Sequence, residues 1–283
     1  MVNNQTKIMS KTIVVTGAGG VLCSTIAEAL AKEGNKIALL DLNKEAAAKV
    51  AEKINSSGGA AIGVKANVLE KESLVLAKET VNKAFGECDI LINGAGGNHP
   101  LGTTSNPFLQ AEDLLNKTEG FKTFFDLDAS GIQFVFNLNF IGTLLPTQIF
   151  AQDMVGREGC SILNVSSMNA FTPLTKIPAY SGAKAAVSNF TQWLAVHFSK
   201  VGIRVNALAP GFFLTEQNRA LLTNEDGSLT PRGNQIIEQT PMGKFGEPEH
   251  LVGTTLWLCG EGASFVTGVV VPIDGGFSAY SGV

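Results

Sequence analysis

The sequence is poor in the residues that most often carry metal and redox chemistry. Its 283 residues include only four cysteines and three histidines, which are scattered along the chain. No CxxC pair occurs, so neither a zinc site nor a disulfide framework is indicated. We therefore expect no metal centre, and unpaired thiols fit a reducing cytoplasm. The residues concerned are Cys23, Cys88, Cys160, Cys259, His99, His197 and His250.

Charge and long hydrophobic runs are also scarce. Charged residues make up 16% of the chain and the net charge is −4, so a basic surface for nucleic acid or anionic lipid is not expected. The most apolar stretch, FVFNLNFIGTLLPTQIF at 134–150, is interrupted by Asn137, Asn139, Pro146 and Gln148. The opening MVNNQTKIMSK has no targeting pattern. These features predict a cytoplasmic protein that binds small molecules, without a nucleic-acid or membrane partner.

What the sequence does contain is a regular alternation of short apolar runs and segments with helical periodicity. Forty-five per cent of the residues are hydrophobic and 31 are glycine, which suits a buried core with tight turns. The alternation predicts an α/β fold: a doubly wound, Rossmann-like parallel sheet of about seven strands with helices on both faces, in one domain spanning 1–283. Strands are expected within 11–17, 36–41, 60–67, 89–96, 161–167, 203–210 and 268–276.

Two segments depart from this rhythm, at about 97–132 and 211–246. Each follows the carboxyl end of an expected strand, where open α/β sheets bind their ligands. We expect these segments to form the walls and lid of a substrate pocket.

The first expected strand ends in a glycine-rich turn, TGAGGVLC at 16–23. Glycines at this position allow a tight turn and let a pyrophosphate approach a helix N-terminus. Asp41 ends the second strand, 24 residues after Gly17, and can accept hydrogen bonds from an adenosine ribose. Its charge would repel a 2′-phosphate, so NAD is favoured over NADP, although Lys44 could soften that preference. The alternative is that Asp41 only caps the helix that begins near Asn43.

A second group of residues predicts proton-transfer chemistry. Tyr180 is one of only two tyrosines, and Lys184 follows it by four residues, so the two side chains share one helix face. A neighbouring ammonium and an oxidised nicotinamide would lower the pKa of the phenol and make it usable as an acid or base. Ser167 ends a strand at the same sheet edge and could hold a substrate oxygen. Taken alone, Tyr180 and Lys184 could instead be an ordinary solvated helix face.

These motifs together make the chain resemble a classical short-chain dehydrogenase/reductase over essentially its full length. The resemblance rests on the glycine turn, NGAG at 93–96, Asn139, Ser167, Tyr180 with Lys184, and PGFFLT at 210–215. It implies that Tyr180 is the acid/base, that Lys184 binds ribose and tunes Tyr180, that Ser167 stabilises the substrate oxygen, and that Asn139 anchors a relay water. Implied cofactor contacts are Gly17, Gly19, Gly20, Val21, Leu22, Asp41, Asn67, Val68, Asn93, Gly94, Ala95, Tyr180, Lys184, Pro210, Gly211 and Thr215.

Some positions depart from the family pattern. Val21 and Cys23 stand where two glycines are usual, Gly94 replaces an asparagine, and Asn67 replaces an aspartate. Cys23 raises the question of how closely the first helix approaches the sheet. We expect these differences to alter affinity more than chemistry.

Within the family the chain resembles the D-mannonate oxidoreductase (fructuronate reductase) branch, which implies a sugar-acid substrate and reduction by NADH. Lys176 and Arg219 are candidates for the substrate carboxylate, and Asn98, His99, Asn169 and Gln217 for hydroxyls, beside Ser167 and Tyr180. The alternatives are another polar ketone such as a ketogluconate, an acyl thioester, and a nucleotide-binding protein without catalysis. By the same resemblance the apolar C-terminal segment implies a homotetramer.

Overall fold

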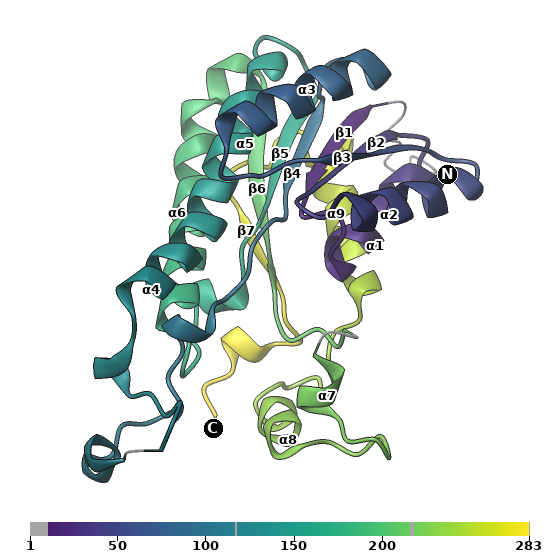
Figure 1. Ribbon diagram of the computed structural model, residues 1–283. Coiled ribbons are helices and arrows are strands. Elements are labelled where there is room, and N and C mark those ends of the chain that lie inside the picture. The colour runs from purple at the N-terminus through teal and green to yellow at the C-terminus, as the bar shows by residue number, and fades with distance from the viewer. Residues whose placement is uncertain (1–10, 117, 216–217, 283) are drawn as a thin grey trace.

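The computed structural model describes residues 11–116, 118–215 and 218–282, and its centre is one parallel sheet (Figure 1). The strand order is β3-β2-β1-β4-β5-β6-β7, and every neighbouring pair is parallel. The predicted fold class is therefore confirmed. The strands are β1 Thr12–Thr16, β2 Lys36–Asp41, β3 Ala60–Lys65, β4 Ile90–Asn93, β5 Cys160–Val165, β6 Ile203–Pro210 and β7 Val270–Ile273.

Helices cover both faces of the sheet, as Figure 1 shows. On one face α1, α2 and α9 enclose a core with Ile13, Leu39 and Ile92, and on the other α3, α5 and α6 enclose a core with Val14 and Leu91. Alternate residues of each strand thus point into opposite cores, which is why the strands are apolar on both sides. The helices are α1 Val21–Lys32, α2 Lys44–Ser56, α3 Lys71–Phe85, α4 Ala129–Phe136, α5 Gly142–Phe150, α6 Pro178–His197, α7 Arg219–Leu222, α8 Pro231–Glu238 and α9 Val252–Cys259.

One helical stretch of the described residues, between β4 and β5, is both long and apolar. The stretch Ala129–Met154, with mean hydropathy 1.3 in its most apolar window, meets the length and composition expected of a membrane span. Half of that window is buried inside the protein, where it contributes Val135, Ile149 and Phe150 to the cores. Core helices meet the same two criteria, so the stretch is weak evidence for a span.

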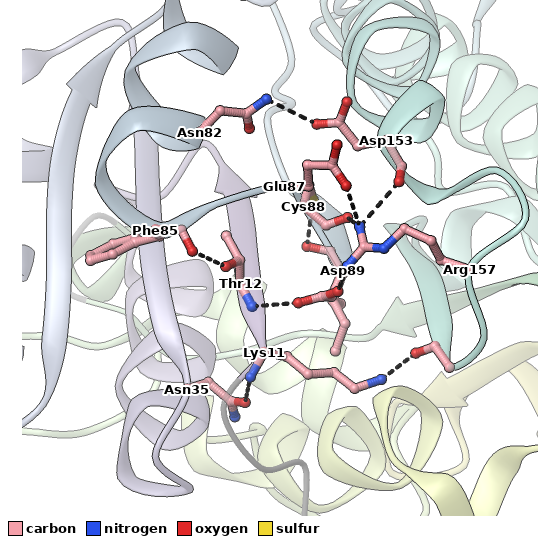
Figure 2. Close-up of polar contacts among 12 residues, drawn as sticks. Lys11, Thr12, Asn35, Asn82, Phe85, Glu87, Cys88, Asp89, Asp153 and Arg157 are labelled. Atoms are coloured by element: carbon pink, nitrogen blue, oxygen red, sulfur yellow. Dashed lines mark hydrogen bonds and ion pairs between the residues drawn. The ribbon is translucent and has the colours of Figure 1, made fainter.

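The amino-terminal edge of the sheet is fastened by a polar cluster that we call the Arg157 clasp, made of Arg157, Asp89 and Thr12 (Figure 2). The Arg157 guanidinium pairs with the Asp89 carboxylate and donates to the carbonyl oxygens of Cys88 and Asp153, both at 3.1 Å. The other Asp89 oxygen accepts from the Thr12 backbone N–H at 2.8 Å. The clasp thereby joins the starts of β1 and β4 to the segment before β5 through charge-assisted hydrogen bonds.

The chain switches direction across the sheet between β1 and β4. After β3 at one edge the chain returns to β4, beside β1, and then builds the other half outward. In folds of this kind the loops leaving the carboxyl ends of the two central strands diverge and leave a crevice. The site must therefore be sought at that crevice.

Candidate active site

A cleft of about 690 Å³ opens at the carboxyl ends of β1, β2 and β4. Its walls are the glycine turn after β1, the end of β2, the loops after β3 and β4, and the loop after β6. The lining residues are Gly17, Gly19, Gly20, Val21, Leu22, Cys23, Asp41, Leu42, Asn43, Ala46, Ala66, Asn67, Val68, Gly94, Ala95, Gly96, Leu138, Gly211, Phe212, Phe213, Thr215 and Asn218.

The turn after β1 needs glycine at two positions, because a side chain at either one would clash with neighbouring atoms. Gly17 has φ +64°, and a Cβ there would lie 2.8 Å from the backbone of Ala95. A Cβ at Gly19 would lie 2.7 Å from the Cβ of Ala46. Helix α1 then begins at Val21 without a side-chain cap at Gly20. Its first N–H groups thus face the cleft end of the helix, an arrangement that suits an anionic group such as a pyrophosphate.

Asp41 closes one end of the cleft. One carboxylate oxygen accepts from the Gly19 N–H and the other from the Asn43 N–H, both at 2.9 Å. The cap of α2 is Asn43, whose side chain accepts from Ala46 N–H at 3.1 Å. Asp41 is therefore not the helix cap, and its partly exposed carboxylate remains part of the cleft wall.

Most residues predicted to contact a cofactor line this cleft, but Asn93, Pro210, Tyr180 and Lys184 do not. Asn93 is buried, and its amide donates to Thr147 Oγ1 at 3.0 Å and Asn164 Oδ1 at 2.9 Å, so it ties β4 to its neighbours. Pro210 is buried at the end of β6. The sequence reasoning missed Leu42, Asn43, Ala46, Ala66, Leu138 and Asn218 as lining residues.

Two departures from the family pattern turn out to face each other in this cleft. A Cβ added at Gly94 would lie 2.1 Å from the Cys23 sulfur and 2.9 Å from the Thr16 carbonyl oxygen. Cys23 is 5% exposed, and burial raises the pKa of its thiol to about 12. The thiol is therefore a packing group, and it occupies the space that a side chain at 94 would need.

Ser167, Tyr180 and Lys184 stand beside the cleft at the carboxyl end of β5. Ser167 follows β5 and accepts from the Asn169 N–H at 3.2 Å, which starts a short turn. Tyr180 and Lys184 lie one turn apart on α6, and Lys184 Nζ is 5.7 Å from the centre of the Tyr180 ring. Lys184 is 3% exposed and donates to the Val165 carbonyl oxygen at 2.7 Å, which fixes its direction.

The direction of the Tyr180 pKa shift differs from the expected one. Desolvation raises the pKa of Tyr180, and only the Ser167 side chain, by hydrogen bonding, opposes it. Burial also lowers the pKa of Lys184 to about 8. The protein alone therefore favours the neutral phenol, and a lower phenol pKa requires a cation outside the chain, such as an oxidised nicotinamide.

Asn139 lies in a π-helical turn, Asn137–Ile141, between α4 and α5. Its side chain is fully buried and donates to the carbonyl oxygens of Gly97 and Val135, both at 2.7 Å, while its amide oxygen accepts from the Gly97 N–H at 3.2 Å. A Cβ at Gly96 would meet both this amide oxygen, at 2.6 Å, and Lys184 Nζ, at 3.1 Å. Asn139 and Lys184 thus approach the same stretch of the loop after β4.

The polar residues predicted for the substrate are spread more widely. Asn169 is buried near Ser167 and donates to Ser181 Oγ at 3.4 Å. His99 accepts from the Leu101 N–H at 3.2 Å through Nδ1, which leaves Nε2 as its donor. Asn98 is exposed and donates to Thr103.

The two predicted carboxylate-binding cations lie apart from this group. Lys176 lines a separate hollow together with Lys122 and Phe124, and Arg219 is exposed at the start of α7. Gln217 lies outside the described residues. Within the described ranges, no group of three His, Cys, Asp or Glu side chains is placed to hold a metal ion.

Two backbone hydrogen bonds join the two ends of the long segment that follows β6. Leu214 N–H donates to the Gly246 carbonyl oxygen at 2.9 Å, and Gly246 N–H donates to the Phe212 carbonyl oxygen at 2.8 Å. Phe212 and Phe213 line both the cleft and an adjacent hollow of about 250 Å³. Helices α7 and α8, which belong to the segment between these two ends, lie below the sheet in Figure 1.

A dinucleotide-sized cleft at the switch point, with a tyrosine and a lysine one helical turn apart beside it, defines the class of protein. The short chain dehydrogenase family matches residues 11–226. The chain belongs to this family, which confirms the resemblance, and it is an oxidoreductase that acts on CH–OH groups.

Among individual proteins, an uncharacterized oxidoreductase from Haemophilus influenzae is 63% identical over 275 residues, with 97% of this chain and 95% of that protein covered. An uncharacterized oxidoreductase, UxuB, from Bacillus subtilis is 50% identical over 277 residues, with 98% of both covered. A crystal structure from Haemophilus influenzae, provisionally named a D-mannonate oxidoreductase and containing bound NAD, is 61% identical, with a TM-score of 0.93 and 98% of both chains covered.

Proposed function

We propose that this protein is an NAD-dependent oxidoreductase that interconverts D-fructuronate and D-mannonate. The observation that carries the proposal is the placement of Tyr180, Lys184 and Ser167 beside a cleft whose far wall carries Asp41. The bound NAD and the provisional name of the similar Haemophilus structure support both parts of the proposal.

The residues of the cleft fit NAD. The glycine turn leaves no room for side chains, the start of α1 suits a pyrophosphate, and Asp41 presents a carboxylate where an adenosine ribose would lie. We propose that Lys184 holds the nicotinamide ribose and that Thr215 contacts the nicotinamide half. The cofactor, when bound, supplies or accepts the hydride.

The remaining steps belong to residues of the chain. In reduction, Tyr180 donates a proton to the ketone oxygen while Ser167 holds that oxygen as negative charge develops. In oxidation the same groups work in reverse, with Tyr180 accepting the hydroxyl proton. Lys184 and the Asn139 turn lie on the route by which the phenol regains its proton from solvent.

The carboxylate at position 41 gives a direct test of cofactor preference. We expect Asp41→Ala to weaken NADH binding by roughly 10- to 100-fold, because it removes charge-assisted hydrogen bonds to ribose. The same change should improve NADPH relative to NADH, because the 2′-phosphate no longer meets a negative charge. Fluorescence titration with both cofactors measures the ratio, and Glu45→Ala on α2 controls for net charge alone. An unchanged ratio would contradict the ribose role.

The substrate proposal is tested by following NADH absorbance with D-fructuronate, its isomer D-tagaturonate, 5-ketogluconate and a neutral ketohexose. We expect turnover largely confined to D-fructuronate, with D-mannonate oxidised in reverse. Preference for 5-ketogluconate would establish the alternative sugar-acid substrate. Equal rates with the neutral sugar would show that the enzyme does not recognise the substrate carboxylate. Lys176 and Arg219 would then have no role as partners of that carboxylate.

We further propose that the chain forms one domain and assembles as a homotetramer. A single continuous sheet with both faces covered supports the first part. The cytoplasm as its compartment stays a prediction from the sequence.

A further inference from the structure

We propose that Thr143, Thr147 and Thr191 are positioning residues for the proton transfer at Tyr180. They belong to a series of buried hydrogen bonds, which we call the polar chain, that joins the helix of Tyr180 to the turn that carries Asn139. Its side chains are those of Asn93, Thr143, Thr147, Asn164 and Thr191. The proposal rests on the proposed function, because it concerns how the same site is held in shape.

The middle of the polar chain joins two strands at the site edge of the sheet. Asn93 ends β4 and pairs in register with Asn164 of β5. The Asn93 amide group donates to Asn164 Oδ1 at 2.9 Å and to Thr147 Oγ1 at 3.0 Å, so both of its hydrogens are used. The side chains of the polar chain are at most 2% exposed. Such deeply buried hydrogen bonds are electrostatically strong, because water does not screen them.

One branch of the polar chain reaches helix α6. The Asn164 amide group donates to Thr191 Oγ1 at 2.9 Å, and the Thr191 hydroxyl donates to the Val187 carbonyl oxygen at 2.8 Å. The residue after Asn164 is Val165, whose carbonyl oxygen accepts from Lys184 Nζ at 2.7 Å. The Lys184 ammonium is therefore held by the same part of β5 that the polar chain fixes.

The other branch ends on the Asn139 carbonyl. Thr147 Oγ1 donates to the Thr143 carbonyl oxygen, and Thr143 Oγ1 donates to the Asn139 carbonyl oxygen, both at 2.8 Å. Threonines that donate to the carbonyl four residues earlier often bend a helix. Asn139 lies in the π-helical turn between α4 and α5, and such turns are rare and recur at functional sites. This branch thus fixes the turn where it departs from the regular helix.

Asn139 is thereby held from two directions by the same strand end. Its side chain bonds to the N–H and carbonyl groups of Gly97, four residues beyond Asn93. Its own carbonyl oxygen is bound by Thr143, at the end of the branch that starts from Asn93. The two branches together therefore set the placement of the Asn139 turn relative to the helix of Lys184, and proton transfer is sensitive to such placement.

The first test replaces one buried hydroxyl by a methyl group. Thr143→Val keeps the shape of the side chain and removes the donor to the Asn139 carbonyl. We expect kcat with D-fructuronate and NADH to fall about 10- to 100-fold, which is the cost of displacing a reacting group on the order of 1 Å. The Kd for NADH should stay within about threefold of its wild-type value. Thr143→Ser keeps the hydroxyl and should recover most of the wild-type kcat.

Thr255 provides a matched control. It is 1% exposed, and its Oγ1 donates to the Leu251 carbonyl oxygen, four residues earlier, at 2.9 Å. It lies in α9, on the opposite face of the sheet and outside the polar chain. Thr255→Val should therefore lower the melting temperature as Thr143→Val does, while its kcat stays within about twofold of the wild-type value.

Hydrogen exchange tests the positioning without any substrate. Because the Asn139 side chain accepts from the Gly97 N–H, a displaced turn should release this amide. We expect the backbone amides of 94–98 to exchange about 10-fold faster in Thr143→Val than in the wild-type protein. Their exchange should be unchanged in Thr255→Val. Deuterium uptake of peptic peptides, measured by mass spectrometry, gives both rates.

The solvent isotope effect tests the link to proton transfer. In Thr143→Val the return of the proton to the phenol should limit turnover. The ratio of kcat in H2O to kcat in D2O should then be larger than in the wild-type enzyme or in Thr255→Val. A loss of activity caused only by unfolding would leave this ratio unchanged.

A pair of variants tests whether the two branches act as one unit. Thr147→Val breaks one branch and Thr191→Val breaks the other, and each should lower kcat. The double variant should lose no more than the more damaging single variant, because either break frees α6 from the Asn139 turn. Two independent sites would instead multiply their losses.

Failure of this proposal and failure of the proposed function give different results. If the wild-type enzyme does not reduce D-fructuronate while exchange at 94–98 responds to Thr143→Val, the substrate is wrong and the polar chain still positions the Asn139 turn. The proposal is overturned if that exchange is unchanged, if Thr143→Val keeps the wild-type kcat, if Thr255→Val reproduces its effects, or if the losses from the two branches multiply.

Discussion

Tyr180→Phe is expected to lower kcat by at least about 10³-fold in both directions while leaving the Kd for NADH within about twofold of its wild-type value. The substitution keeps the ring, which packs beside Val135 and Ala183, and removes only the hydroxyl. On the proposed mechanism, turnover therefore loses its proton donor, whereas the cofactor cleft keeps its walls. Steady-state rates and fluorescence titration separate the two effects.

The other tyrosine provides a matched control. Tyr280 is 42% exposed near the C-terminal end, and Tyr280→Phe should retain the wild-type rate. On the proposed mechanism, reduction by the wild-type enzyme needs the protonated phenol and should fall as pH rises through the pKa of Tyr180, while oxidation needs the phenolate and should rise. Because desolvation raises that pKa, both transitions should lie on the alkaline side unless bound cofactor lowers them. Most of the activity surviving in Tyr180→Phe would refute the mechanism.

Gly94→Ala is expected to destabilise the protein by about 1–3 kcal/mol and to weaken NADH binding, because its Cβ would overlap the Cys23 sulfur. Cys23→Gly in the same chain should recover part of this loss by vacating the space. Recovery is partial because the Thr16 carbonyl oxygen also lies 2.9 Å from that Cβ. Denaturant unfolding of the two single variants and the double variant should give a coupling of at least about 0.5 kcal/mol.

Two further glycines serve as controls that distinguish the contact between Cys23 and Gly94 from steric crowding elsewhere in the protein. A Cβ at Gly63 would lie 2.7 Å from the Ala48 backbone nitrogen, so Gly63→Ala should cost the same in the wild-type chain and in the Cys23→Gly variant. A Cβ at Gly97 would meet only Leu138, at 3.5 Å, and should be tolerated. Equal losses for Gly94→Ala in the wild-type chain and in the Cys23→Gly variant would rule out the steric pairing.

The fold was largely predictable because its signals are local. Each strand is a short apolar run and each main helix a periodic segment, and the order in which they alternate leaves few topologies. The segment 103–116 and 118–127, between β4 and α4, was not predictable in the same way. Its two turns are held by Asp113 and Asp126 and its apolar groups are exposed, so it carries neither a helical nor a strand periodicity.

The candidate site could be predicted where its chemistry requires a particular residue type. It could not be predicted where the packing of neighbouring elements determines which residues come into contact. The spacing of Tyr180 and Lys184 corresponds to one helical turn. The position of Asp41 relative to the glycine turn follows from the length of one β-α-β unit. In contrast, the contact between Cys23 and Gly94 joins positions 71 apart in sequence and depends on how closely α1 approaches β4. Lining residues such as Leu138 contribute shape, for which the sequence holds no distinctive residue type.

The position of the Arg157 clasp affects which parts of this protein can change during evolution without loss of stability. The clasp fastens the strand starts, whereas the cleft and its loops lie where the strands end. Changes to the loops that choose a substrate therefore need not disturb the fastening, and the two edges can accumulate mutations under separate selection. A lineage with this architecture can change its substrate at one edge while its folding stability is preserved at the other.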